Sequence, residues 1–184
     1  FEGRMGLGNG HVLPRGPLKE GLAGLARADA VVVIDGPLPQ VDESQILSRV
    51  SQSVCFGSLR RASRLYSLGT AAPLSLGSLE GQDVGLLSGL AYPASFESLI
   101  ASLGARVVAR RRFADHHRYR PIDVANLSSA APVWLVTEKD AVKLNPDWVV
   151  GSDVRVLEIE MEPDAEFVRW LSESVRARIP SQSI

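Results

Sequence analysis

Two of the three histidines in this chain stand side by side in the segment FADHHRY, residues 113–119. An imidazole ordinarily titrates near neutrality, so it can exchange a proton with a substrate at physiological pH. Adjacent residues of an extended segment point in opposite directions, so His116 and His117 are poorly placed to bind one metal ion together. We therefore expect one histidine to face a site as a proton acceptor or orienting group. A pair of plain surface histidines is the alternative.

Positive charge is concentrated around this segment, and guanidinium groups bind phosphate well. Arg112 is therefore a candidate substrate-binding residue, and Lys139 in TEKDAVK (137–143) is a candidate anion ligand. A solvated surface is the alternative for both. Aromatic residues make up only 6% of the chain, which disfavours a nucleic-acid partner. Residues 105–120 contain one acid, Asp115, and six arginines: Arg106, Arg110, Arg111, Arg112, Arg118 and Arg120.

The positions of these residues depend on a sheet that the hydrophobic pattern predicts. Strands are expected in five segments: AVVVID (30–35), DVGLLSGL (83–90), ARVVARRRF (105–113), PVWLVT (132–137) and VRVLEIEM (154–161). Helices are expected in five others: near 18–25, near 46–50, 95–103 with Ser95 as its cap, 121–130, and from Asp164 onward with Phe167, Trp170, Leu171 and Val175 buried. The alternation of strands and helices favours an α/β fold with a mainly parallel sheet flanked by helices.

Three polar segments come directly after predicted strands, namely SGLAYP (88–93), FADHHRY and TEKDAVK. The carboxyl ends of parallel strands meet at one edge of a sheet, where open α/β sheets bind ligands. The sequence therefore predicts a site at this edge, with the histidines displayed beside the two other segments.

Composition narrows the class of protein. With 184 residues, 45% hydrophobic and 22% charged, the chain is an ordinary globular one, and its net charge of −1 creates no general attraction for nucleic acid. The single cysteine, Cys55, excludes an internal disulfide and is expected to be a small buried apolar residue.

A segment rich in Gly, Ser and Ala, residues 54–82, is predicted to be a linker in which runs 54–59 and 63–68 pair as a β-ribbon.

Several blocks together resemble a known family. In chain order they are GLGNGHVLPRGPLKE (6–20), RADAVVV, SGLAYPASFESLIASLGARVV, FADHHRY and WLVTEKDAVKL. This order is similar to the C-terminal half of the tetraacyldisaccharide 4'-kinases, which phosphorylate the disaccharide precursor of lipid A with ATP. The resemblance covers residues 1 to about 145, and the DHH and TEKDAVK blocks are its most specific parts.

The resemblance implies a division of the chain and a set of site residues. Residues 1–53 would be the end of a P-loop kinase lobe, 54–82 a β-stranded linker, and 83–184 a C-terminal α/β/α lobe. The family's Asp-His pair falls on Asp115 and His116, where the histidine assists a catalytic aspartate of the amino-terminal part. The other implied residues are Asn9, Lys19 and Glu20 for the substrate and Glu2, in place of the usual aspartate, for the metal.

The resemblance also implies partners and a location. ATP and Mg²⁺ would be bound mostly by an amino-terminal half, and the lipid A precursor would be met at the cytoplasmic face of the bacterial inner membrane. Phe1 opens a stretch that is neither a signal peptide nor a domain start, so we expect a fragment. No GxxxxGK[ST] occurs in the chain, and we expect no turnover from these residues alone. The alternative is a non-catalytic α/β module that binds a phosphorylated sugar or nucleotide through Arg110–Arg112.

Overall fold

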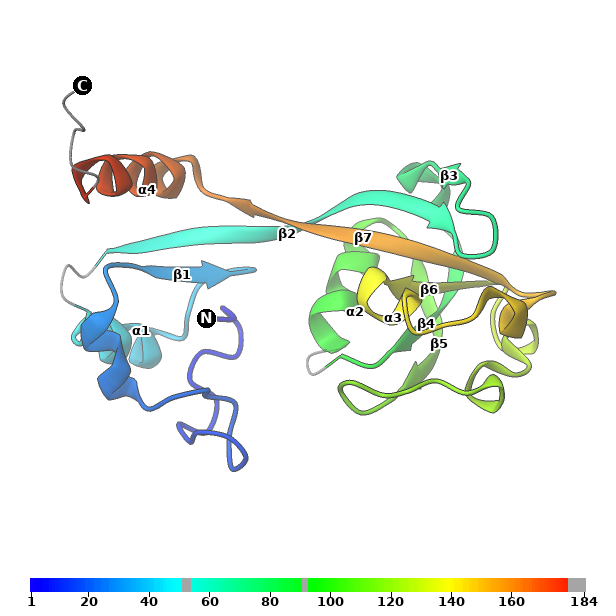
Figure 1. The fold of residues 1–184 in the computed structure, drawn as a ribbon, viewed down its shortest axis with the longest axis horizontal. Coiled ribbons are helices and arrows are strands. Elements are labelled where there is room, and N and C mark those ends of the chain that lie inside the picture. Colours follow the sequence, from blue (N-terminus) through cyan, green and yellow to red (C-terminus); the bar gives the residue numbers. More distant parts are fainter. Residues whose placement is uncertain (51–53, 91–92, 179–184) are drawn as a thin grey trace, which may run out of the picture. The chain divides into compact units, whose positions relative to one another are not determined.

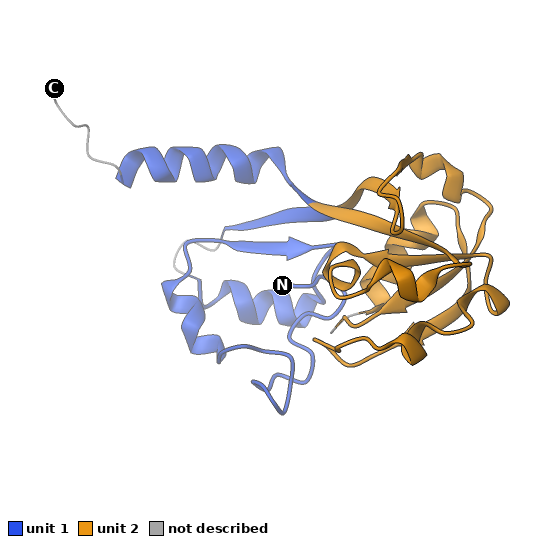
Figure 2. Cartoon of the chain, turned by 45° about the vertical axis from the view of Figure 1, so that its right-hand side comes forward, with its two compact units in different colours: residues 1–60, 161–184 blue, residues 61–160 orange. Residues whose placement is uncertain are grey.

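The computed structural model of the protein describes residues 1–50, 54–90 and 93–178 (Figure 1). The chain divides into two compact units (Figure 2). Unit 1 contains Phe1–Arg60 and Met161–Ile184, and unit 2 contains Arg61–Glu160. Strands β2 (Cys55–Ser67) and β7 (Asp153–Pro163) each contribute residues to both units. Residues 161–184 thus belong to the same unit as the first sixty residues. The domain boundaries at 53 and 82 that the family resemblance implies stay a prediction.

Unit 2 is built on a mainly parallel sheet, as the sequence predicts. Strand β4 pairs in parallel with β5 and with β6, and β6 pairs in parallel with β7. Its elements in chain order are β3 (Pro73–Leu74), η2 (Leu76–Leu79), β4 (Asp83–Ser88), α2 (Pro93–Ser102), β5 (Arg106–Arg112), η3 (Pro121–Val124), η4 (Leu127–Ser129), β6 (Val133–Thr137), α3 (Glu138–Ala141) and η5 (Pro146–Val149).

Side chains of β4 and β6 fill a core on both faces of this sheet. All five residues of β6 are buried, which is typical of a parallel strand covered on both sides. Because side chains alternate along a strand, Leu87 and Trp134 pack in one cluster with Val124 and Leu127, while Leu86 and Leu135 pack in another. The second cluster includes Phe96 and Ile100 of α2.

Helix α2 shows the predicted apolar face but begins earlier than expected. It starts at Pro93, so Ser95 lies inside the helix and is not its N-cap residue. Proline suits the first helical turn, since its missing N–H would have no partner there. Gly104 follows the helix in a left-handed conformation, with φ +80°, and ends it.

Unit 1 has its own small core beneath strand β1. Strand β1 pairs in parallel with β2, from Val31 beside Cys55 to Ile34 beside Ser58. The core consists of Leu7, Leu18, Val31, Val33, Leu38, Ile46 and Val50. The remaining elements of this unit are η1 (Leu22–Arg27), β1 (Val31–Ile34), α1 (Gln40–Leu47) and α4 (Ala165–Arg178).

Several local expectations are wrong. The runs 54–59 and 63–68 do not pair with each other, because residues 55–67 form one uninterrupted strand, β2, whose antiparallel partner is β3. Residues 121–130 form two 3₁₀ turns instead of a helix, and Asn126 between them has φ +56°, which breaks helical geometry. Cys55 is exposed rather than buried.

Helix α4 buries less than its pattern predicts. Phe167 and Trp170 are half-buried, with ring centroids 5.3 and 5.5 Å from that of Phe56 on β2. Leu171 and Val175 remain 44% and 46% exposed. The helix thus rests on β2 through its aromatic row, and the predicted burial of Leu171 and Val175 is wrong.

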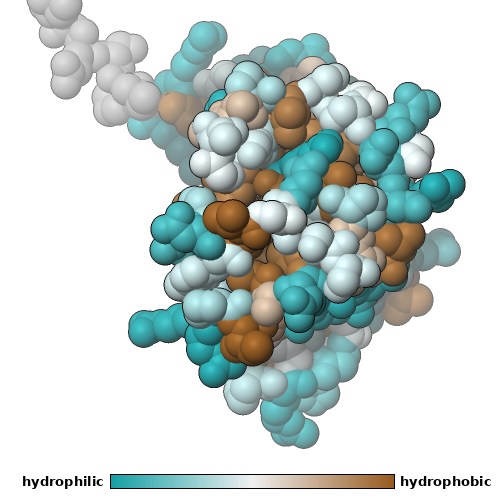
Figure 3. Space-filling view, turned by 90° about the vertical axis from the view of Figure 1, so that its right-hand side faces the viewer, coloured by the Kyte–Doolittle hydropathy of each residue, from teal (hydrophilic) through white to brown (hydrophobic). Residues whose placement is uncertain are grey.

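Val168, Leu171 and Val175 are exposed along one face of α4, and other exposed hydrophobic side chains are spread along the chain. On the face drawn in Figure 3, hydrophobic and hydrophilic side chains are interspersed. Such scattering is normal for a protein surface. Among the described residues, no helix is both long enough and apolar enough to cross a bilayer.

Replacing Gly85 by alanine should destabilise unit 2. A Cβ atom at Gly85 would lie 2.6 Å from ring atoms of the buried Trp134, so strand or ring would have to shift. Overpacking of this kind costs about 1–3 kcal/mol, and urea unfolding should show that loss. Gly77→Ala is the control, because its Cβ would meet only Ser75 Oγ at 3.5 Å. Equal stability of the two variants would contradict the packing described.

Candidate functional site

The three polar segments meet at the carboxyl edge of the sheet of unit 2. Gly89 follows β4, and a Cβ atom there would lie 3.1 Å from Asp140 Oδ1, 3.2 Å from the Tyr119 hydroxyl and 3.3 Å from the Ala114 carbonyl oxygen. These contacts join the segments after β4, β5 and β6, which confirms the predicted shared edge. Residues 91–92 of SGLAYP lie outside the described residues.

Asp140 is the polar centre of this edge. Its carboxylate is fully buried and accepts a hydrogen bond from the Gly89 N–H at 3.0 Å. Lys143 Nζ lies 3.3 Å from the other oxygen, and the Thr137 hydroxyl donates a longer bond of 3.4 Å. The Tyr119 hydroxyl is buried without a well-formed hydrogen bond, and burial together with the nearby Asp140 charge raises its pKa. Asp140 therefore ties the β6 segment to the β4 segment.

The segment after β5 presents one histidine and packs the other. His116 lies at an exposed tip with its side chain 83% accessible, and Asp115 Oδ1 accepts a hydrogen bond from the His116 N–H at 3.1 Å. Asp115 Oδ2 is 3.7 Å from His116 Nε2, close enough for charge interaction but too long for a hydrogen bond. His117 is only 26% accessible and its Nε2 lies 3.0 Å from Asp123 Oδ2. The two histidines thus differ in what they can do.

The arginines of this region are largely paired with acids from other elements. Arg110 Nε lies 3.0 Å from Glu97 on α2, and Arg112 contacts the same carboxylate. Burial opposes ionisation of Glu97, but hydrogen bonds from Arg112 and Arg110 outweigh it and keep the pKa of that carboxyl below its usual value. Arg106 pairs with Asp83. The local excess of positive charge is therefore partly neutralised, and Glu97 competes with any phosphate for the Arg112 guanidinium.

Lys139 lies beyond this paired set. It is exposed in the first turn after β6, next to the buried Asp140. Glu138, on its other side, accepts a hydrogen bond from the Ile159 N–H at 3.2 Å. The structure places the Lys139 ammonium at the predicted edge, and its role with an anion stays a prediction.

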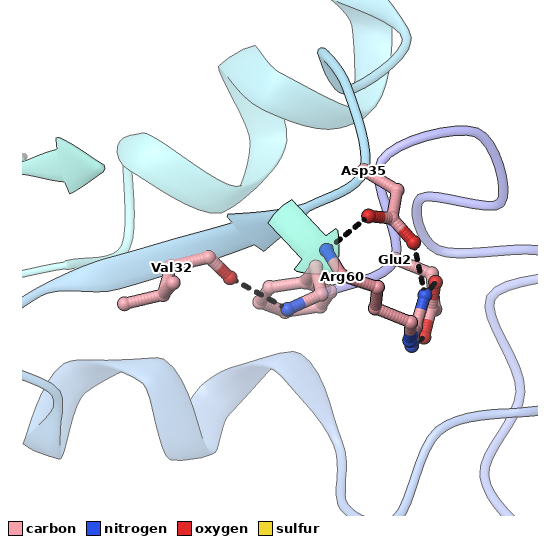
Figure 4. A network of polar contacts seen from close by, with 5 residues as sticks. Glu2, Val32, Asp35 and Arg60 are labelled. Atoms are coloured by element: carbon pink, nitrogen blue, oxygen red, sulfur yellow. Dashed lines mark hydrogen bonds and ion pairs between the residues drawn. The ribbon is translucent and has the colours of Figure 1, made fainter. Parts of the chain in front are cut away.

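In unit 1, Glu2 belongs to a compact ion-paired network (Figure 4). Arg60 donates to both carboxylate oxygens of Glu2, with the longer bond 3.0 Å, and to Asp35 through its side chain and its backbone N–H, the latter at 2.8 Å. Asp35 has φ +59°, an uncommon conformation that places its carboxylate toward Arg60. Nothing in the sequence pattern pointed to Asp35 or Arg60.

The glycine-rich segment of unit 1 is folded on itself. Asn9 donates from Nδ2 to the Arg15 carbonyl oxygen at 2.8 Å and accepts from the His11 N–H at 3.1 Å. Glu20 pairs with Arg27 at 2.7 Å on the exposed surface, and Lys19 beside it is exposed. Asn9 therefore shapes the turn that carries these residues, while contact of Asn9, Lys19 or Glu20 with a substrate stays a prediction.

Removal of the Asp140 carboxylate should weaken unit 2. Asp140→Ala leaves the Gly89 N–H and the Lys143 ammonium without their acceptor, and a buried polar group left unpaired costs about 1–3 kcal/mol. Urea unfolding measures the loss. Asp83→Ala is the control, since exposed ion pairs such as that with Arg106 contribute about 1 kcal/mol or less. A loss no larger than the control's would refute a central role for Asp140.

Acid should remove the stabilisation that Asp123 provides. Hydrogen bonds from His117 and Arg120 outweigh partial desolvation and lower the pKa of Asp123 from 3.8 to about 2. A carboxyl with a lowered folded-state pKa stabilises the fold above its unfolded pKa and loses that effect as pH falls through the folded one. The stability difference between the wild type and Asp123→Asn should therefore shrink between about pH 4 and pH 2. A difference that stays constant in urea titrations over this window would argue against the pairing.

Known proteins resemble this chain over nearly its whole length. The LpxK family, described as Tetraacyldisaccharide-1-P 4'-kinase, matches residues 1–176. A tetraacyldisaccharide 4'-kinase of Rhodospirillum rubrum is 34% identical over 98% of this chain and 53% of its own length. One from Anaeromyxobacter sp. (strain Fw109-5) is 39% identical over 88% of this chain and 45% of its own.

A solved structure shares the fold. The crystal structure of LpxK from Aquifex aeolicus in complex with ATP aligns with a TM-score of 0.54, at 23% identity, over 91% of this chain and 49% of that one. This chain thus spans about half the length of the relatives that it matches. Taken with the Asp-His tip at the sheet edge, the family match shows that the chain belongs to the tetraacyldisaccharide 4'-kinase family.

Proposed function

We propose that these residues form the acceptor-facing part of an enzyme that transfers the γ-phosphate of ATP to the 4'-hydroxyl of the lipid A disaccharide precursor. Family membership supports the reaction class, and the chain spans about half the length of the relatives whose names give the activity. The observation that carries the proposal is the Asp115–His116 tip, which displays an accessible imidazole at the carboxyl edge of a parallel sheet.

The tip is suited to handling the proton of the acceptor hydroxyl. In the transfer, the hydroxyl oxygen forms a bond to the γ-phosphorus, the bond to the ADP oxygen breaks, and the hydroxyl proton must go to a base. His116 Nε2 can accept that proton or orient a catalytic aspartate that does, and the Asp115 carboxylate lies 3.7 Å from this nitrogen. His117 is unsuited to this role because its Nε2 already lies against Asp123.

Arg60 competes with a metal ion for the carboxylate of Glu2. Magnesium supplies charge neutralisation of the phosphates when it is bound. Both Glu2 oxygens are engaged by Arg60, as is Asp35, and no cluster of three or more potential ligands occurs among the described residues. The residues that the structure describes do not by themselves fit a magnesium site, so we propose that the metal ligands come mainly from elsewhere.

Exposed polar side chains of this chain are candidates for binding the substrate. We assign this role to Asn9, Lys19, Glu20 and Arg112, with Lys139 for an anionic group. Because the proposed acceptor is a lipid, we propose that the reaction takes place at a membrane surface, on the cytoplasmic side where ATP is present. The alternative of a binding module that uses Arg110–Arg112 loses support, because Arg110 and Arg112 share Glu97 and Arg111 donates to the Asp123 carbonyl oxygen.

Loss of the His116 imidazole should slow phosphate transfer without affecting the fold. In the complete protein, His116→Ala should lower kcat by roughly 10²–10⁴-fold, as is typical of lost acid–base assistance. The assay follows ATP-dependent phosphorylation of the disaccharide precursor. Val150→Ala, at a similarly exposed position, should retain full activity. An unchanged rate in His116→Ala would remove this residue from the mechanism, and an inactive wild type would refute the function.

A further inference from the structure

The second histidine of the DHH segment is packed in an aromatic cluster. The His117 ring stacks on Phe113, with centroids 4.5 Å apart and planes 20° from parallel. Tyr119 meets His117 edge-on at 5.1 Å and Phe113 at 5.2 Å. The cluster draws the start and the end of the segment 113–119 together, which leaves Asp115 and His116 at its tip.

Asp123 fastens this cluster to the next turn and to the end of β5. Its carboxylate meets His117 Nε2 at 3.0 Å and accepts from the Arg120 N–H at 2.9 Å. Its carbonyl oxygen accepts from Arg111 Nη1 at 3.0 Å, and the Arg111 guanidinium also lies over the Trp134 ring at 5.5 Å. A chain of contacts therefore runs from the buried core through Asp123 to the His117 ring.

The tip itself is in an uncommon backbone conformation. His116 has φ +61°, in the left-handed region that residues other than glycine seldom adopt. Such conformations persist where the surrounding structure determines them. The His117 N–H donates to the Ala114 carbonyl oxygen at 3.1 Å, which closes a tight turn around Asp115 and His116. The contacts of His117 are the nearest restraints that could hold this turn.

We propose that His117 and Asp123 are positioning residues, which together hold the Asp115–His116 tip in its left-handed turn and so aim the His116 imidazole. The proposal rests on the proposed function for its effect on catalysis. His116 then acts on the acceptor hydroxyl, and His117 acts only by holding its neighbour His116 in place. Two features of the His117 side chain serve separate purposes. Its Nε2 meets Asp123, and its flat ring stacks on Phe113.

Amide hydrogen exchange of the complete protein tests the restraint without reference to activity. His117→Phe keeps a flat ring but loses the nitrogen that meets Asp123, and Asp123→Asn weakens the same bond from the other side. Both should speed exchange of the peptide covering residues 113–118 by about tenfold, as expected for the loss of one charged hydrogen bond. Asp83→Asn, which alters an exposed pair at the start of β4, should leave that peptide unchanged. Wild-type exchange in both test variants would overturn the restraint.

Kinetics of the same variants test the positioning role. His117→Phe and Asp123→Asn should each lower kcat by about 10- to 100-fold with KM for ATP unchanged, because misplacement of a reacting group by about 1 Å has effects of this size. The double variant should be no slower than the worse single one, since both changes break the same bond. His117→Gln, whose amide can still donate to Asp123, should recover part of kcat.

The outcomes separate this inference from the proposed function. Wild-type kcat in His117→Phe and Asp123→Asn would overturn the positioning role, as would losses that multiply in the double variant. An inactive wild-type protein would refute the kinase proposal, while the exchange measurement would still decide whether His117 and Asp123 hold the tip.

Discussion

One buried carboxylate organises the edge on which the proposed chemistry depends. Asp140 is fully buried and accepts the Gly89 N–H, so it joins the segment after β6 to the segment after β4. The Tyr119 hydroxyl lies beside the same point, which brings in the segment after β5. A buried charge is costly unless it is paired, so this carboxylate keeps its neighbours in place. The exposed Asp115–His116 tip belongs to the segment whose Tyr119 lies beside this buried carboxylate.

Ion pairs in this protein join residues that lie far apart in the sequence. Arg110 and Arg112 share Glu97, and Arg60 is held between Glu2 and Asp35. Each of these groups would otherwise suggest a site for an anion or a metal ion. Their pairing reduces the number of charged groups available to bind ligands, whereas Lys19, Lys139 and His116 among the proposed site residues are exposed.

The hydrophobic pattern predicted the sheet well and the surface poorly. The core was predictable because burial sets the hydrophobic pattern of the elements that form it. This pattern is a continuous apolar run in β4 and β6, and a four-residue spacing of Phe96 and Ile100 in α2. Leu171 and Val175 continue an apolar period on α4 without being buried. The sequence predicts two separate runs, 54–59 and 63–68, whereas one strand, β2, covers residues 55–67, since pairing with a neighbour outweighs weak local preference.

The sequence by itself determined that several strands run in one direction, and hence that the DHH and TEKDAVK segments share an edge, because topology follows from the order of elements. Only the tertiary structure decided which histidine is presented. His117 is held by Asp123 and by the rings of Phe113 and Tyr119, whereas His116 is turned outward by a positive φ angle. It also decided that the arginines are paired, since Glu97 and Asp83 approach them only when α2 and β4 pack beside β5. Contacts between residues far apart in the chain carry no local signal.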